Sequence, residues 1–145
     1  MLKKILIGFV VVLIIIQFFR IDKTNPPVDA TIDLAQVVEV PAPVHQILES
    51  ACFDCHSNTT VYPWYTNVAP FSWWIKDHID KGRDELNFSE WGSYSDKRRL
   101  HKIEEMDEKV KEGKMPLKSY ILVHREADLS KAQQEIMLNW IKTLN

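Results

Sequence analysis

The sequence has no excess of charge of either sign, and this absence narrows the range of functions. Its 145 residues include 18 lysine and arginine residues against 20 aspartate and glutamate residues, giving a formal net charge of -2. A protein that binds nucleic acid normally carries a clear basic excess, because it must neutralise phosphates. We therefore expect no nucleic-acid partner.

Cysteine is also scarce, and its spacing excludes several roles. The chain contains only Cys52 and Cys55, and a disulfide between such close residues would close almost no loop and add little stability. No second closely spaced pair of ligands completes a zinc site, and the βαβ context of a thioredoxin-like pair is missing. The two thiols are therefore expected to serve chemistry rather than stability.

No segment alternates apolar and polar residues as a half-buried strand does, and no internal repeat is present. Apolar residues instead recur at spacings of three and four, which is typical of amphipathic helices. We therefore predict an all-α fold. The predicted helices run from Pro43 to the cysteines, from Pro70 to between Gly82 and Leu86, from Ser95 to Gly113, and from Ser130 to Leu144.

An uncharged apolar run from Ile5 to Phe19 follows two lysines and is closed by Arg20. Its length is at the short end of what spans a bilayer, about 17 to 25 residues. A cleaved secretory signal would be followed closely by small residues, and none is found there. We predict an N-terminal transmembrane helix within residues 1–21 that anchors the protein to a membrane, with a signal segment as the alternative.

The segment after this run contains several prolines and no sustained helical period. Pro26, Pro27 and Pro41 each fix a backbone angle and lack an N–H donor, which favours extended chain. We predict an extended spacer over residues 22–42. The folded domain is then predicted to cover residues 43–145.

Cys52-Phe53-Asp54-Cys55-His56 has the spacing used for c-type haem attachment. In such a site the two thiols form thioethers to the porphyrin, and the adjacent histidine binds the iron. Because both sulfurs fix one edge of the ring, the next imidazole is positioned beneath the metal. We predict one covalent haem c held by Cys52, Cys55 and His56.

The second axial ligand must come from elsewhere, and Met115 in Gly113-Lys114-Met115-Pro116 is the main candidate. A thioether is a soft, uncharged ligand that favours ferrous iron and raises the reduction potential. The proline restricts the backbone beside it. The predicted iron ligands are therefore His56 and Met115, and a core methionine that fills a gap is the alternative role for Met115.

Other residues compete for the second axial position. His78 lies on the apolar face of a predicted helix, where a histidine is more typical of the core or of a propionate contact. His101 lies among basic residues and is expected to be solvated. His124 follows a loop that could approach the haem. His45 and Met106 are the remaining alternatives.

Several short motifs follow one another along the chain: Cys52-Phe53-Asp54-Cys55-His56-Ser57-Asn58, Pro63-Trp64-Tyr65, Ser72-Trp73-Trp74 with His78 and Gly82-Arg83, Asn87-Phe88-Ser89 with Trp91, and Gly113-Lys114-Met115-Pro116. Together they resemble the small bacterial haem-binding domain family, which is related to cytochromes c. The resemblance covers about residues 44–140 and implies the same site, with Cys52, Cys55 and His56 holding the haem and Met115 as the distal ligand. It implies a small cytochrome c-like helical domain around one covalent haem.

The cofactor chemistry predicts a membrane-anchored monohaem c-type cytochrome that transfers single electrons between redox partner proteins, with no small-molecule substrate. Covalent haem attachment takes place outside the cytoplasm, so we expect the domain at the periplasmic face of the bacterial inner membrane. The alternatives are a peroxidase-like haem enzyme and a haem-based gas or redox sensor. Either would need a displaceable distal ligand, and the enzyme would need an acid-base group such as His78 or His124.

Overall fold

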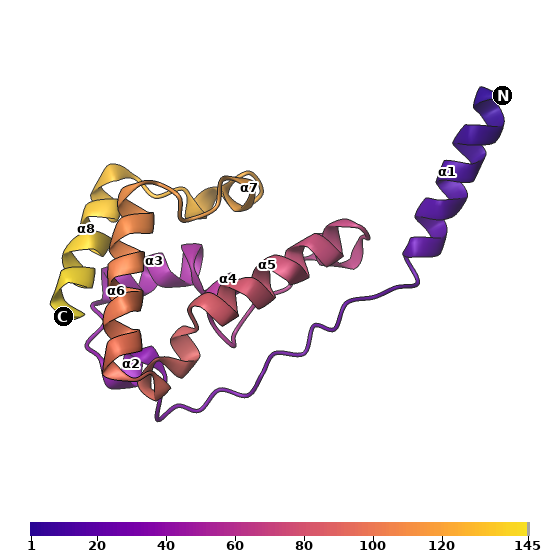
Figure 1. Ribbon diagram of the computed structural model, residues 1–145. Helices are drawn as coiled ribbons and strands as arrows, with labels where there is room; N and C mark the ends of the chain where they lie inside the picture. The colour runs from indigo at the N-terminus through magenta and orange to yellow at the C-terminus, as the bar shows by residue number, and fades with distance from the viewer. Residues whose placement is uncertain (145) are drawn as a thin grey trace.

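The computed structural model describes residues 1–144, and within them the chain forms helices and no strands, so the prediction of an all-α fold is confirmed (Figure 1). The α-helices are α1 (Leu2–Ile16), α2 (Leu34–Val37), α3 (Ala42–Ala51), α4 (Phe53–His56), α5 (Phe71–Glu85), α6 (Asp96–Lys111), α7 (Lys118–Ile121) and α8 (Lys131–Ile141). Short 3₁₀ helices lie between and after them: η1 (Trp64–Asn67), η2 (Phe88–Ser93), η3 (Arg125–Ala127) and η4 (Lys142–Leu144).

The ends of the two longest core helices follow from local sequence. The Ser95 side chain accepts a hydrogen bond from the Arg98 N–H at the start of α6, and Ser130 forms a complete capping box with Gln133 at the start of α8. Gly113 follows α6 with a φ of 64°, a left-handed conformation that glycine adopts without steric cost. The predicted starts of both helices and the predicted end of α6 are confirmed. α8 ends at Ile141, before the predicted Leu144, and the 3₁₀ helix η4 follows it.

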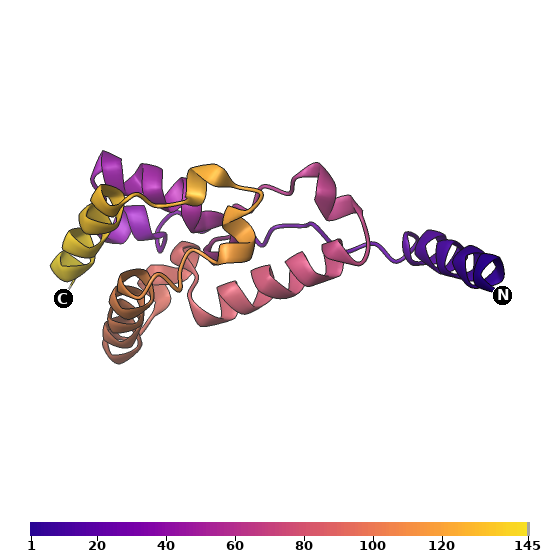
Figure 2. The ribbon, with the colours of Figure 1, turned by 90° about the horizontal axis from the view of Figure 1, so that it is seen from above.

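One hydrophobic core holds α3, α6, α8 and η2 together. Trp91 and Leu48 lie at its centre with no exposed surface, and α6 and α8 lie side by side in both ribbon views (Figures 1 and 2). The indole N–H of Trp140 in α8 also donates to the Glu39 carbonyl at 3.1 Å. The buried members of this core are Leu34, Val44, Ile47, Leu48, Leu86, Phe88, Trp91, Tyr94, Ile103, Met106, Val110, Met137, Trp140 and Ile141.

The remaining helices form a more open part of the domain. α5 packs against α4 and extends away from the core, and η1 packs beside the beginning of α5. α7 is linked to α4 by a side-chain hydrogen bond, in which the Tyr120 hydroxyl donates to the Asp54 carboxylate at 2.8 Å. This open part holds most of the residues predicted to form the haem site.

The N-terminal helix differs from the sequence prediction. α1 has 15 residues, none of them buried, and it projects away from the other helices (Figures 1 and 2). The helix ends at Ile16, before the apolar run does, and the Gln17 side chain that follows exchanges two 3.0 Å hydrogen bonds with the backbone of Ala69. Among the described residues no helix combines the length and the apolar character needed to cross a membrane. The transmembrane helix predicted within residues 1–21 is therefore not supported.

The proline-containing segment also holds more structure than an extended spacer. Asp33 caps α2 by accepting a hydrogen bond of 3.0 Å from the Ala35 N–H, and Leu34 is buried in the core against η2. The Gly92 N–H donates to the Ile32 carbonyl at 2.7 Å. The apolar residues between Pro27 and Pro41 keep no sustained helical period, so sequence patterns alone did not indicate this contact.

Candidate functional site

The C-x-x-C-H motif lies on a bend between two helices rather than at the end of one. α3 ends at Ala51, and Cys52 has φ −128° and ψ −45°, outside the helical region, before α4 begins at Phe53. Cys55 and His56 follow in α4, and both cysteines are free thiols. The bend turns the motif toward α5, against which α4 packs.

All four residues predicted to hold the haem line one cavity of about 190 Å³. Met115 comes from the loop after α6 and is brought there by a turn. The Lys114 and Met115 N–H groups both donate to the Lys109 carbonyl, at 2.9 and 3.2 Å. The cavity is lined by Ala51, Cys52, Asp54, Cys55, His56, His78, Lys81, Gly82, Glu85, Met115, Pro116, Leu117 and Tyr120. Met115 lies 59 residues after His56 in the sequence, and the fold brings both residues to the same cavity.

The imidazole of His56 is held in one orientation. Its Nδ1 lies 2.9 Å from the carbonyl oxygens of both Gly82 and Leu86. A carbonyl only accepts hydrogen bonds, so Nδ1 carries the hydrogen and Nε2 keeps its lone pair. Burial lowers the pKa of His56, which favours the neutral ring, the form that binds a metal. Phe88 packs edge-on against this ring, with a centroid distance of 6.4 Å.

A glycine allows α4 to approach α5 this closely. A Cβ atom on Gly82 would lie 2.6 Å from the Cys55 carbonyl oxygen, closer than real Cβ contacts come. Any other residue at this position would push the two helices apart. Gly82 therefore serves the site twice, since its own carbonyl also accepts the His56 hydrogen bond.

The two thiols are shielded and protonated. Burial raises the pKa of Cys52 to about 12 and that of Cys55 to about 11. A redox-active or metal-binding cysteine normally has a lowered pKa, because the thiolate is the reactive form. Within residues 1–144 there is also no group of three or more His, Cys, Asp and Glu side chains that could hold a metal ion. The site therefore gives no support to a zinc centre or a thioredoxin-like pair.

The competing candidates lie in different places. His78 lines the cavity, and its Nδ1 lies 2.8 Å from the Trp74 carbonyl. His101 is exposed and lies 3.6 Å from Glu105 on the same helix, while His45 pairs with Glu49 at 3.5 Å. Met106 is buried in the core. Of these residues, only His78 faces the cavity that contains His56 and Met115.

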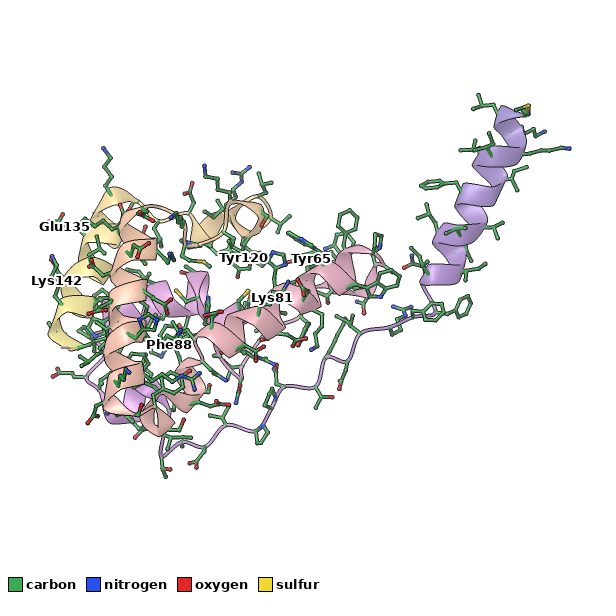
Figure 3. The ribbon with its side chains drawn as sticks, viewed as in Figure 1. Tyr65, Lys81, Phe88, Tyr120, Glu135 and Lys142 are labelled. Atoms are coloured by element: carbon green, nitrogen blue, oxygen red, sulfur yellow. The ribbon has the colours of Figure 1, made fainter. Side chains whose placement is uncertain are left out.

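A second group of polar residues lies beside the cavity. The Tyr65 hydroxyl makes a short hydrogen bond to Nε2 of His124, and Nδ1 of His124 lies 3.0 Å from the Glu126 carboxylate. The Tyr120 ring stacks on His124 with a centroid distance of 4.2 Å. Figure 3 shows Tyr65 and Tyr120 near each other between α5 and α7. No sequence signal indicated this group, because Tyr65 and His124 are 59 residues apart.

Comparison with known proteins agrees with the chemistry of these residues. A family model described as a haem-binding domain matches residues 11–143. The comparisons with curated proteins and with solved structures gave no match. A neutral imidazole, a thioether and two adjacent thiols around an apolar cavity are the groups that a haem of the c type requires. The residues present therefore fit this cofactor.

Proposed function

The chain belongs to the haem-binding domain family, and from that premise we propose that it is a membrane-attached c-type cytochrome that carries one covalent haem and transfers single electrons. The observation that carries this proposal is the meeting of Cys52, Cys55, His56 and Met115 around one cavity. This set provides two attachment points on one side and two candidate iron ligands from separate elements.

Each residue has a stated role in the proposal. Cys52 and Cys55 would attach the porphyrin edge through thioethers, and His56 would bind the iron through Nε2. Met115 would supply the distal thioether. When bound, the haem supplies an iron that accepts and releases one electron. The chain's own part is to hold the ligands still, since a ligand set that does not change keeps reorganisation small.

The surroundings of the site support an electron carrier. The Gly82 and Leu86 carbonyls fix the His56 ring in one tautomer, so its orientation does not depend on the state of the metal. Leu117 and Pro116 add apolar surface beside Met115. Apolar walls limit the access of water, which is one of the ways in which a protein raises the potential of a haem.

We further propose that the protein acts at a membrane surface outside the cytoplasm, at the periplasmic face of the bacterial inner membrane. α1 supports this proposal, because apart from Lys3 and Lys4 its side chains are apolar and none is buried in the protein, so that it can insert them into lipid. Covalent haem attachment of the c type also takes place outside the cytoplasm. The redox partners would be proteins that exchange electrons with the domain at this surface.

A spectroscopic comparison tests the function directly. The full chain, co-expressed with the c-haem maturation factors, should retain haem after denaturing electrophoresis. Its oxidised spectrum should show the charge-transfer band of a methionine bound to ferric iron. Met115→Leu should abolish the band, because it removes the sulfur while nearly conserving the volume. Met106→Leu is the matched control, since Met106 is buried in the core away from the cavity, and it should keep the band.

Two other results would refute parts of this proposal. Loss of all haem on denaturation would refute covalent attachment. Retained haem with an unchanged spectrum in Met115→Leu, together with ready binding of carbon monoxide, would refute Met115 as a ligand. That second result would favour the haem enzyme or the sensor, because both need an open or displaceable sixth position.

A further inference from the structure

The chain that follows α1 is bound to the domain at the turn between η1 and α5. The Gln17 side chain exchanges two hydrogen bonds of 3.0 Å with the backbone of Ala69. The Arg20 guanidinium donates to the Asn67 carbonyl at 2.9 Å, and the Lys23 ammonium donates to the Asn67 side-chain oxygen at 2.6 Å. Four hydrogen bonds therefore hold the chain after α1 against this turn.

The same segment stays bound to the domain after this turn. The Asn25 amide donates to the Thr60 carbonyl at 2.9 Å, and its oxygen accepts a hydrogen bond of 2.8 Å from the Arg83 guanidinium. The Asn58 amide donates to the Pro27 carbonyl at 3.0 Å. These contacts limit how far the domain can turn relative to the end of α1, which a free tether would not do.

Exposed aromatic side chains gather at the same place. Trp73 in α5 donates its indole N–H to the Phe19 carbonyl at 2.9 Å, and the residue is 39% exposed. Phe18 and Phe19, on the segment after α1, are 81% and 64% exposed. We call Phe18, Phe19 and Trp73 the aromatic cluster. Large apolar residues that stay exposed together are typical of a surface that contacts another molecule or a membrane.

Other exposed apolar residues at this end of the domain belong to the proposed haem site. A second cavity of about 530 Å³ shares Cys55, His78 and Tyr120 with the cavity described above, so the two form one larger hollow. Trp64 and Phe71 are exposed and line this second cavity. The aromatic cluster lines neither cavity, so the haem site does not account for its exposed surface.

Two cations lie next to the aromatic cluster. Arg20 and Lys23 donate only to uncharged oxygens of Asn67, and none of the ion pairs within residues 1–144 includes either of them. The carboxylate of Asp22, between them in the sequence, accepts a hydrogen bond of 2.8 Å from the Thr24 N–H. The two positive charges are therefore available to an anion at the surface, such as the phosphate of a lipid headgroup.

The order of residues at this end matches the layers of a membrane surface. The side chains of α1 after Lys4 are apolar and none is buried, and aromatic and basic residues follow them. Tryptophan favours the level of the lipid headgroups, because its ring is apolar and its N–H is polar, and lysine and arginine favour the phosphates. Figures 1 and 2 show that α1 leaves the domain near the beginning of α5, on the side opposite α6 and α8. When α1 lies in lipid, the aromatic cluster is therefore the part of the domain nearest to the lipid surface.

We propose that the aromatic cluster docks the domain on the surface of a phospholipid bilayer, with Trp73 in the headgroup layer and anionic headgroups at Arg20 and Lys23. This inference rests on the proposed function, because the attachment of α1 to a membrane comes from there, and no part of it involves the haem. It gives the domain one orientation, with the beginning of α5 against the membrane and with α6 and α8 away from it. The extended spacer predicted from the sequence would leave this orientation free.

Photocrosslinking to lipid tests the orientation. The full chain, in nanodiscs of phosphatidylcholine and phosphatidylglycerol, carries one photoreactive residue at a time: Trp73→p-benzoylphenylalanine in the aromatic cluster, Phe9→p-benzoylphenylalanine in α1, or Leu100→p-benzoylphenylalanine in α6. Leu100 is the matched control, because it is 48% exposed, more than Trp73, but lies on the far side of the domain. After irradiation, mass spectrometry of the peptides should find lipid adducts at residues 73 and 9 and none above background at residue 100.

Partitioning of the full chain onto lipid vesicles tests the contact with headgroups. Arg20→Gln/Lys23→Gln should weaken binding to vesicles that contain phosphatidylglycerol by about twentyfold, since each basic residue at an anionic surface contributes about fivefold. Binding to vesicles of phosphatidylcholine alone should stay within about twofold of the original. Lys97→Gln/Lys111→Gln is the matched control, because it removes the same charge from α6, and it should bind both kinds of vesicle as the unmodified chain does.

The outcomes separate this inference from the proposed function. Adducts at residue 9 without adducts at residue 73, or equal adducts at residues 73 and 100, would overturn the docking face and leave α1 as the membrane attachment. Adducts at residue 73 without adducts at residue 9 would refute α1 as the attachment and support the docking face. Absence of adducts at all three positions would overturn both. Equal weakening by the two double variants would overturn the contact of Arg20 and Lys23 with headgroups.

Discussion

The two halves of the domain use the same kinds of residue for opposite purposes. In the half formed by α3, α6, α8 and η2, the large apolar residues are enclosed by protein, and Trp91 has no exposed surface. In the half formed by η1, the start of α5 and α7, residues of equal size line cavities, and Trp64 is mostly exposed. Apolar content alone therefore does not identify a core. The side chains without protein partners mark where a cofactor or ligand would complete the fold.

The largest loss of stability is expected from a substitution in the enclosed half. Trp91→Ala should lower the free energy of unfolding by about 3–5 kcal/mol, because it leaves a cavity that the surrounding helices cannot fill. Chemical denaturation of the full chain, followed by far-ultraviolet circular dichroism, measures the change. A loss below about 1 kcal/mol would contradict the distinction between the enclosed and the open half, since burial of Trp91 would then contribute little to stability.

The junction of the two halves should be the next most sensitive place. Gly82→Ala puts a Cβ atom 2.6 Å from the Cys55 carbonyl oxygen, and overpacking of this kind costs about 1–3 kcal/mol. It should also lower the yield of covalent haem, because α4 would be displaced. The two measurements are denaturation and haem staining of the denatured chain.

Gly8→Ala is the matched control for this substitution. Gly8 also lies within a helix, but nothing lies within 4 Å of the place that its Cβ would occupy. The change should leave haem attachment unaltered. If both variants attach haem as the original chain does, the close contact of α4 and α5 is not required for the site.

Helix caps and contiguous motifs are the features of this molecule that its sequence predicts. Ser95, Ser130 and Gly113 were identified because capping depends on neighbours along the chain. The C-x-x-C-H motif is contiguous, and Met115 stood out because glycine and proline flank it. The structure brings all four predicted residues to one cavity, while their chemical roles stay predictions.

The parts that were missed depend on contacts between distant segments. The hydrogen bond between Tyr65 and His124 joins residues 59 positions apart, and neither residue has a neighbour that predicts the other. Leu34 is buried because η2 covers it, although its own segment reads as extended chain. Just after α1, Gln17 contacts Ala69, 52 residues away, which hydropathy does not reveal. Local patterns predicted the longer helices α3, α5, α6 and α8, whereas the short helices and the cavities depend on how distant segments meet.

A smaller loss of stability is expected from a change at the N-terminal cap of α8, a helix of the enclosed half. Ser130→Ala removes the side-chain acceptor for the Gln133 N–H and breaks the capping box. The expected loss in the free energy of unfolding is about 1 kcal/mol. Ser130→Asp keeps an acceptor at the same place and should recover most of it. Equal losses in both variants would mean that the hydroxyl contributes through another contact.

The smallest effect should come from a tryptophan in the open half. Trp64→Ala should change the free energy of unfolding by less than about 0.5 kcal/mol, because the side chain is already 78% exposed and its loss leaves no enclosed cavity. The same denaturation experiment measures it, and Trp91→Ala provides the contrast with an identical substitution. If Trp64→Ala destabilised the chain as much as Trp91→Ala, the open half would be part of the core.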